Sequence, residues 1–176
     1  MPSPILLTAL VLTSAGWINT GPELGKAEGQ CRPNEQGPAF LIDVVGLKDS
    51  KGLLKLEVYP SNDADFLQDD NILLNAGKVF RRVEIEAPKS RNATMCVRVP
   101  GPGTYSVTVL HDRDKNRKFG ITIDGVGFAS NPKLGWSKPK AAAARATAGS
   151  GVTRITIVLN YLHGFGFSPI KEARRQ

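Results

Sequence analysis

Several segments of the chain alternate apolar and polar residues with a period of two, which is typical of half-buried β-strands. The alternating segments are residues 53–59, 79–86, 95–99, 105–110 and 155–161, and a short apolar run at residues 40–45 precedes them. No segment keeps an apolar period of 3.6 residues through three capped helical turns. The pattern therefore predicts strands as the main elements.

The stretches between these strands are rich in turn-forming residues. The chain has 18 Gly and 12 Pro residues spread along it without a period, with turn-forming clusters at residues 46–52 (GLKDSKG) and 100–103 (PGPG). Many short strands joined by turns favour an all-β fold, and we predict an antiparallel β-sandwich of about seven strands. Tyr105 follows the second cluster, and its hydroxyl is expected to bond back to the loop; an ordinary cross-strand aromatic is the alternative. Residues 141–148 (AAAARATA) fit either a helix or an edge strand.

The length of 176 residues suits one ordinary domain. We assign residues 28–162 to a single β-sandwich domain, residues 1–27 to a signal peptide with a flexible leader, and residues 163–176 to a C-terminal tail. No apolar run reaches the roughly 18 to 20 residues that a transmembrane helix needs. No transmembrane segment is therefore expected in the mature chain.

The first residues have features of a secretory signal. Residues 5–12 (ILLTALVL) have the length of a signal h-region, and small residues follow at 13–16. Residues 1–4 contain no Lys or Arg, so either the signal is atypical or the start codon is misplaced. A buried first strand is the alternative for this run. We expect an exported protein, located in the periplasm or outside the cell.

The two cysteines agree with export. Cys31 precedes the first predicted strand and Cys96 lies inside a later one, so a disulfide would join the N-terminal arm to the body of the domain. Two free thiols are the alternative. The chain contains no C-x-x-C motif and no His at metal spacing, which argues against redox catalysis and zinc binding.

The charge is divided unevenly along the chain. Residues 1–86 carry a net charge of −4, residues 87–176 carry +11, and the whole chain carries +7. A basic half can attract an anionic polymer of the cell envelope or an envelope protein; solubility and protected strand edges are the alternative explanation. The basic residues are not accompanied by an aromatic RNA signature, zinc spacing or a recognition helix, so no nucleic acid partner is expected.

One loop has the spacing of a calcium site. Asp112, Asp114 and Asn116 occupy alternate positions, as the first oxygen ligands of a calcium loop do, and Asp124 is a fourth candidate ligand. These four residues are the candidate metal site, and calcium is the only cofactor considered. A calcium-dependent ligand-binding module is thus an alternative to a purely structural or binding protein.

The rest of the calcium signature is missing. Arg117 stands where Gly normally permits the sharp turn, and Ile123 stands where the bidentate Glu belongs. Four cations within residues 113–118 would lower metal affinity. The alternative is an Asx-type turn whose carboxylates cap backbone amides and pair with these cations.

No catalytic constellation is evident, so we expect a non-catalytic protein. The chain has only His111 and His163, and no G-x-S-x-G nucleophile elbow. Residues 168–171 match S-x-x-K, but a Pro interrupts the would-be helical turn. Gly125 and Gly127 do not make a dinucleotide fingerprint, because a third Gly and a following helix are absent.

Three motifs resemble a known family. Residues 103–109 (GTYSVTV), 111–116 (HDRDKN) and 125–132 (GVGFASNP) resemble the bacterial exported family called domain of unknown function 2141, whose pattern is G-T-Y-x-V-x-V, H-D-x-D-x-N and G-x-G-F-S-N-N. The residues that match its loop motifs are His111, Gly125, Gly127, Phe128 and Asn131. The resemblance implies a transthyretin-like (prealbumin-like) β-sandwich and supplies no reaction. The histidines and C-terminal motif of transthyretin-related hydrolases are absent, so that activity is not expected.

Overall fold

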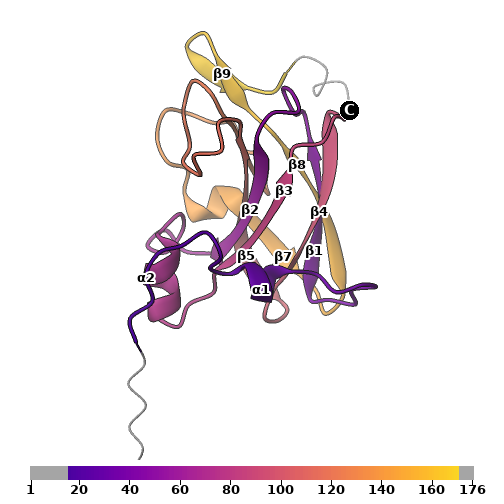
Figure 1. The fold of residues 1–176 in the computed structure, drawn as a ribbon, viewed down its shortest axis with the longest axis vertical. Coiled ribbons are helices and arrows are strands. Elements are labelled where there is room, and N and C mark those ends of the chain that lie inside the picture. Colours follow the sequence, from indigo (N-terminus) through magenta and orange to yellow (C-terminus); the bar gives the residue numbers. More distant parts are fainter. Residues whose placement is uncertain (1–15, 171–176) are drawn as a thin grey trace, which may run out of the picture.

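The computed structural model describes residues 16–170, and within them the chain is almost entirely β-structure. Ten strands and three short helical segments follow one another along this part of the chain (Figure 1). In order, they are α1 (Lys26–Gly29), β1 (Ala39–Val45), β2 (Leu53–Pro60), α2 (Asp70–Asn75), β3 (Arg81–Glu86), β4 (Asn92–Arg98), β5 (Gly103–Asp112), β6 (Gly125–Phe128), the 3-10 helix η1 (Ala141–Ala144), β7 (Arg145–Ala148), β8 (Val152–Val158), β9 (Tyr161–His163) and β10 (Gly166–Ser168).

The strands form two facing sheets and one small hairpin. One sheet has the order β4-β1-β8, and the other has the order β3-β2-β5-β6, with β7 also paired to β5. The all-β prediction is confirmed. The strands outnumber the seven expected because β6, β9 and β10 are only three or four residues long and show no alternation. Moreover, β1 pairs with β8 in parallel, so the sandwich is not antiparallel throughout.

The core lies between the two sheets and consists of the apolar side chains that the alternation places on one face of each strand. Leu54, Leu56 and Val58 of β2 are fully buried there, and Val107 and Val109 of β5 lie in the same cluster. The three-stranded sheet contributes Phe40, Ile42, Val44, Met95, Val97 and Ile157. The period of two therefore identifies the inward faces correctly.

Tyr105 closes one end of this core. Its hydroxyl donates to the carbonyl oxygen of Gly101 over 2.9 Å, four residues back in the loop. Its ring meets Phe40 edge to face, with 6.2 Å between the ring centroids. The predicted bond from the hydroxyl back to loop backbone is confirmed, and it holds the turn before β5 against the core.

The five-stranded sheet is also covered on part of its outer face. A second apolar cluster contains Tyr59, Phe66, Leu73, Phe80 and Phe128. The helix α2 and the helical turn η1 contribute to this cluster, and in Figure 1 they lie on the side of the sheet away from β1 and β4. Residues 141–148, which fitted a helix or a strand, are both: η1 leads directly into β7. The remainder of the outer face forms the floor of the candidate site.

Both ends of the described chain form specific hydrogen bonds. Within residues 16–27, Ile18 exchanges two hydrogen bonds with the side chain of Asn75, and the Thr20 hydroxyl donates to Asp70 over 2.6 Å. Residues 161–168 form the hairpin β9-β10. The predicted signal segment at residues 5–12 lies outside the described residues. Within residues 16–170, no helix is long and apolar enough to cross a membrane.

A disulfide joins the N-terminal segment to the sandwich, as predicted. Cys31 is bonded to Cys96 of β4, 65 residues further along the chain. Gln30 forms an isolated β-bridge with Val97 beside it. The bond therefore fastens the segment that approaches the outer face of the five-stranded sheet.

Candidate functional site

His111 is enclosed at the end of β5 and has a structural role. Its Nε2 atom lies 2.8 Å from the carbonyl oxygen of Lys51, which can only accept, so Nε2 carries the proton. Its Nδ1 atom therefore accepts the hydroxyl of Tyr161 over 2.6 Å, and the Tyr161 oxygen accepts the backbone amide of Lys48 over 3.0 Å. Burial lowers the pKa of His111, because the protonated ring would lose its hydration. The imidazole is thus neutral and fully engaged.

The glycines of the third motif are required by close packing. A Cβ atom on Gly125 would lie 2.3 Å from the ring of Tyr161, and one on Gly127 would lie 2.5 Å from a methyl group of Ile157. Neither position has room for a side chain, because real Cβ atoms do not approach other heavy atoms so closely. These glycines let β6 lie against β8 and β9.

Phe128 and Asn131 also have structural roles. Phe128 packs against Phe66, with 6.2 Å between the ring centroids. The side chain of Asn131 donates to the carbonyl oxygen of Thr156 over 2.9 Å and accepts the amide of Val158 over 2.8 Å, so it fastens the loop after β6 to β8. The five predicted loop-motif residues therefore stabilise the fold around the loops.

Three of the four predicted metal ligands do meet. Carboxylate oxygens of Asp112, Asp114 and Asp124 lie within 4.8 Å of one another, and the first and third of these residues are buried. The fourth, Asn116, lies beside them: its side-chain amide donates to Asp114 over 2.7 Å. Burial and the neighbouring Asp114 and Asp124 carboxylates raise the pKa of Asp112, although the amide of Arg117 opposes them. The arrangement concentrates negative charge at the start of the loop.

The same carboxylates also cap backbone amides. Asp112 accepts the amides of Asn116 over 3.1 Å and of Arg117 over 2.8 Å. Asp124 accepts the amides of Arg113 over 2.8 Å and of Gly120 over 2.7 Å. The Asx-type turn expected as the alternative to calcium is therefore present. The amide donors occupy some of the lone pairs of each carboxylate, and the other lone pairs remain available to a cation.

The cations of the loop are directed elsewhere. Arg113 binds Asp49, with its Nε atom 3.1 Å from a carboxylate oxygen. Lys115 lies 2.9 Å from Glu86. Arg117 reaches Glu84 over 3.4 Å. The expected pairing of these cations with the loop carboxylates is therefore wrong, because the acidic side chains of β3 and of the turn after β1 provide other partners.

A large pocket lies on the outer face beside α2 and η1, and both of these elements contribute to its lining. Its volume is about 1510 Å³. Strands β2, β3 and β5 provide its floor, and its walls come from the loop after β5, the loop after β6 and residues 20–22. Ligand sites commonly have volumes of about 300 to 1,000 Å³, so this pocket exceeds the needs of one small molecule.

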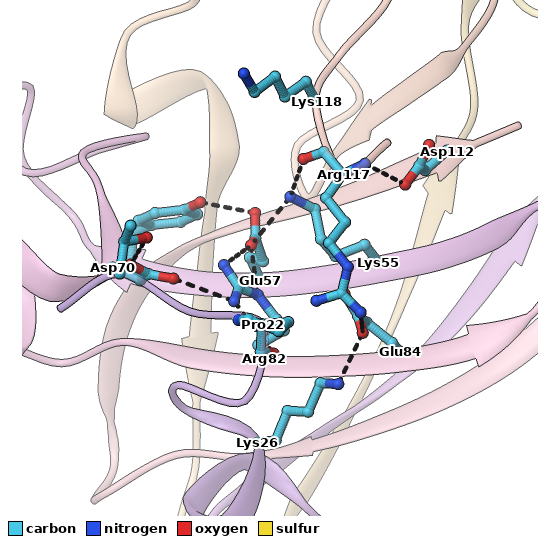
Figure 2. A network of polar contacts seen from close by, with 12 residues as sticks. Pro22, Lys26, Lys55, Glu57, Asp70, Arg82, Glu84, Asp112, Arg117 and Lys118 are labelled. Atoms are coloured by element: carbon cyan, nitrogen blue, oxygen red, sulfur yellow. Dashed lines mark hydrogen bonds and ion pairs between the residues drawn. The ribbon is translucent and has the colours of Figure 1, made fainter. Parts of the chain in front are cut away.

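The floor of the pocket is a buried network of paired charges (Figure 2). Glu57 accepts Nε of Arg82 over 2.9 Å and the hydroxyl of Tyr59 over 2.8 Å. Arg82 also lies 3.2 Å from Asp70 and donates to the carbonyl oxygen of Gly21 over 3.1 Å. Burial by itself would lower the pKa of Arg82, but Glu57 and Asp70 outweigh it and raise the pKa. The floor is therefore charged, rigid and internally neutralised.

A second set of contacts ties the floor to the loop above it. Lys55 lies 3.3 Å from Glu57 and donates to the carbonyl oxygen of Arg117 over 3.1 Å. Glu84 binds Lys26 of α1 over 2.9 Å as well as Arg117 (Figure 2). The network thus fixes the loop after β5 over β2 and β3, and it fixes the acidic loop and the pocket relative to each other.

The rim of the pocket carries exposed aromatic rings and cations. Trp136 is 63% exposed and Phe119 is 45% exposed, and the ring of Phe167 lies 5.8 Å from the first and 6.2 Å from the second. Three exposed lysines complete the rim: Lys118, Lys133 and Lys140. Among residues 16–170 none of these three amines forms an ion pair. Figure 2 shows Lys118 standing apart from the floor network.

The sequence motifs do not point to this pocket. Glu57 and Arg82 occupy polar positions of alternating strands, where a solvated face is the usual expectation. The available signal is Trp136, a large aromatic residue in the lysine- and proline-rich stretch 131–140 (NPKLGWSKPK). A Trp in such a loop is a candidate contact residue, because little in the stretch can bury it.

Comparison with known proteins gives a family. The family model described as an uncharacterized protein conserved in bacteria (DUF2141) matches residues 42–156, which include most of the sandwich and both loops around the pocket. No curated protein and no solved structure matches the chain. The chain belongs to the bacterial DUF2141 family.

Proposed function

We propose that this protein is an exported, non-catalytic binding module of the cell envelope that holds an anionic polymer in the pocket on the outer face of its five-stranded sheet. The observation that carries the proposal is the pocket itself. Its floor charges are already paired, and its rim presents three lysines without ion pairs, so the charge offered to a ligand is positive.

The charges that line the pocket favour an anion. Seven Lys and Arg residues line it against four Asp and Glu residues. The acids are Glu57, Asp69, Asp70 and Glu84. Three of them bind cations of the floor or of α1, and the three rim lysines without ion pairs outnumber the fourth acid, Asp69. A cleft with an excess of one sign of unpaired charge attracts ligands of the other sign.

The buried titratable groups support a binding role without catalysis. His111 is fully buried between a carbonyl oxygen and a tyrosine hydroxyl, out of reach of a substrate in the pocket. Glu57 and Asp70 are both held by Arg82, so both carboxylates are occupied. A general acid or base needs a free lone pair or proton beside the substrate, and the partners of these two carboxylates leave little capacity for that role.

Export is supported by the apolar N-terminal run and by the disulfide. Disulfides persist in oxidising compartments such as the periplasm, and the bond between Cys31 and Cys96 fastens the segment that lines one side of the pocket. Fractionation of cells producing the full chain should place the processed protein in the periplasm or medium. Recovery in the cytoplasm with two free thiols would contradict this part of the proposal.

The test of polymer binding uses polygalacturonate, an acidic polymer, and the purified protein at low and high salt. Replacing the three rim lysines by glutamine (K118Q, K133Q and K140Q) should weaken binding at least tenfold. A control variant removes three exposed cations away from the pocket: R32Q, K51Q and K89Q. The control should bind nearly as tightly as the wild type. Equal losses in both variants would mean that net charge alone is responsible and would contradict the proposal.

A second candidate function is calcium binding at the start of the loop after β5. One observation in its favour is that the carboxylates of Asp112, Asp114 and Asp124 lie close together. A second is that two arginines and a lysine of the loop form ion pairs with acids outside this cluster. Calcium accepts carboxylate oxygens at flexible geometry and can complete its coordination with water or ligand oxygens. Because the floor network fixes this loop beside the pocket, a bound cation would add an attraction for the same anionic polymer.

A further inference from the structure

We propose that the polymer is an acidic polysaccharide, and that Trp136, Phe119 and Phe167 form the surface on which its sugar rings stack. The inference rests on the proposed function of the pocket and specifies the chemical class of its ligand. It depends on the presence of both aromatic rings and cations along the rim. A simple polyanion would need only the cations.

The three rings form one continuous apolar wall. Phe167 of β10 lies between the other two, with ring centroids 5.8 Å from Trp136 and 6.2 Å from Phe119. Trp136 and Phe119 nevertheless remain 63% and 45% exposed. An exposed apolar patch inside a groove marks a contact surface, and an aromatic face suits a flat partner of similar width. The C–H face of a pyranose ring is such a partner.

Each exposed ring has a rim lysine close to it in sequence. Lys118 precedes Phe119 directly, and Lys133 lies three residues before Trp136 in the same wall. A ligand that uses both features has an apolar ring face and carboxylates at its edge, as a uronic acid unit has. The volume of about 1510 Å³ suits several linked rings better than one.

The floor argues against a lipid chain. An acyl chain lying over Glu57, Arg82 and Lys55 would cover charged groups without offering hydrogen bonds in return. Sugar hydroxyls provide those bonds. The amine of Lys55 uses two of its three donors, toward Glu57 and the carbonyl oxygen of Arg117, which leaves one for a ligand.

Polyphosphate and polyglutamate satisfy the lysines but lack a rigid apolar ring face. They would therefore bind through charge alone, with affinity that depends on the rim lysines and is indifferent to Trp136. An acidic polysaccharide should depend on both. This difference separates the polysaccharide inference from the broader proposal of an anionic ligand.

The experiment compares oligogalacturonate with polyglutamate of equal charge number, using the disulfide-bonded protein and titration calorimetry. W136A should weaken oligogalacturonate binding at least tenfold and leave polyglutamate binding unchanged. The control W17A removes the other tryptophan, which is 73% exposed and does not line the pocket. It should change neither affinity. Circular dichroism should show an unaltered melt for both variants, since both side chains are exposed.

A spectroscopic readout accompanies the affinities. The chain has two tryptophans, so W17F leaves Trp136 as the single reporter, and its emission should shift when oligogalacturonate binds. Equal affinities for the two polymers, together with no effect of W136A, would overturn the polysaccharide inference while the lysine-dependent function stands. No loss of binding in the rim lysine variant would overturn the function itself. Absence of oligogalacturonate binding to the wild type would overturn the inference.

Discussion

The hydroxyl of Tyr161 lies 2.6 Å from Nδ1 of His111, and together these two residues join β9 to the end of β5. The same hydroxyl oxygen accepts the amide of Lys48 from the turn after β1. The Tyr161 ring occupies the space that a side chain at Gly125 would fill. The end of β5, the turn after β1 and β6 thus all meet at one tyrosine of β9, directly beside the acidic loop.

Removing this hydroxyl should destabilise the protein. In Y161F the buried Nδ1 atom of His111 and the part-buried amide of Lys48 both lose their partner; an unsatisfied buried polar group costs about 1 to 3 kcal/mol, and a part-buried one costs less. We expect the free energy of unfolding in urea to fall by about 2 to 4 kcal/mol. A matched variant, Y105F, loses one bond at a less buried site and should lose about 1 kcal/mol. A loss below about 0.5 kcal/mol in Y161F would contradict the described network.

His111 should also make stability depend on pH. Burial lowers its pKa, so the unfolded chain, with a pKa near 6.5, binds the proton more readily than the folded chain. The stability contributed by neutral His111 is complete above about pH 6.5 and falls as the pH drops below that value. The loss is at most about 1.4 kcal/mol for each pH unit.

The measurement is urea unfolding at pH 7.5 and 5.5 in EDTA, for the wild type and H111Q. Glutamine can donate to Lys51 and accept from Tyr161, and it does not titrate. Arg113 lowers the pKa of Asp49, so that carboxyl contributes below about pH 4 and not in this window. The raised pKa of Asp112 acts in the opposite direction in both proteins. Equal pH dependence in the two proteins would show that His111 is not the titrating group.

Packing around Tyr161 predicts a large effect of a single methyl group. G125A places a Cβ atom 2.3 Å from the Tyr161 ring, and overpacking of this kind costs about 1 to 3 kcal/mol. G166A is the control, since nothing lies within 4 Å of its Cβ position. Thermal melts should show a lower Tm for G125A and an unchanged Tm for G166A. Equal melts would mean that β6 can move away from β9 at no cost.

Calcium binding predicts a change in stability by linkage. At one hundred times its Kd, calcium should add about 2.7 kcal/mol, which corresponds to roughly 5 to 10 °C in Tm for a domain of this size. D114N removes one exposed carboxylate of the cluster and should abolish most of the shift, whereas E28Q, an exposed acid on α1, should preserve it. Identical melts of the wild type in calcium and in EDTA would eliminate the calcium candidate.

Much of the fold can be predicted from the sequence because period-two alternation directly encodes which side chains face the core. Leu54, Leu56 and Val58 are buried as their pattern indicates. The alternation does not encode strand partners, so the parallel pairing of β1 with β8 is not predictable. The hairpin β9-β10 is too short to show a pattern.

The two candidate sites also differ in how far the sequence predicts them. The acidic cluster is predictable because Asp112 and Asp114 are close in sequence, but the direction of the loop cations depends on Asp49, Glu84 and Glu86, which are distant in sequence. The pocket is less predictable still. Its charged floor comes from β2 and β3 and its aromatic wall comes from two later loops and β10, so only the assembled fold shows that they share one cleft.

The most direct test of the proposed binding site is a map of NMR chemical-shift changes when oligogalacturonate is added to the labelled protein. The account predicts that the largest changes occur at the indole N–H of Trp136 and at the backbone amides of Lys118, Phe119 and Lys133, and that they shrink as salt is added. Changes confined to the opposite sheet, β4-β1-β8, or no changes at saturating ligand, would contradict it.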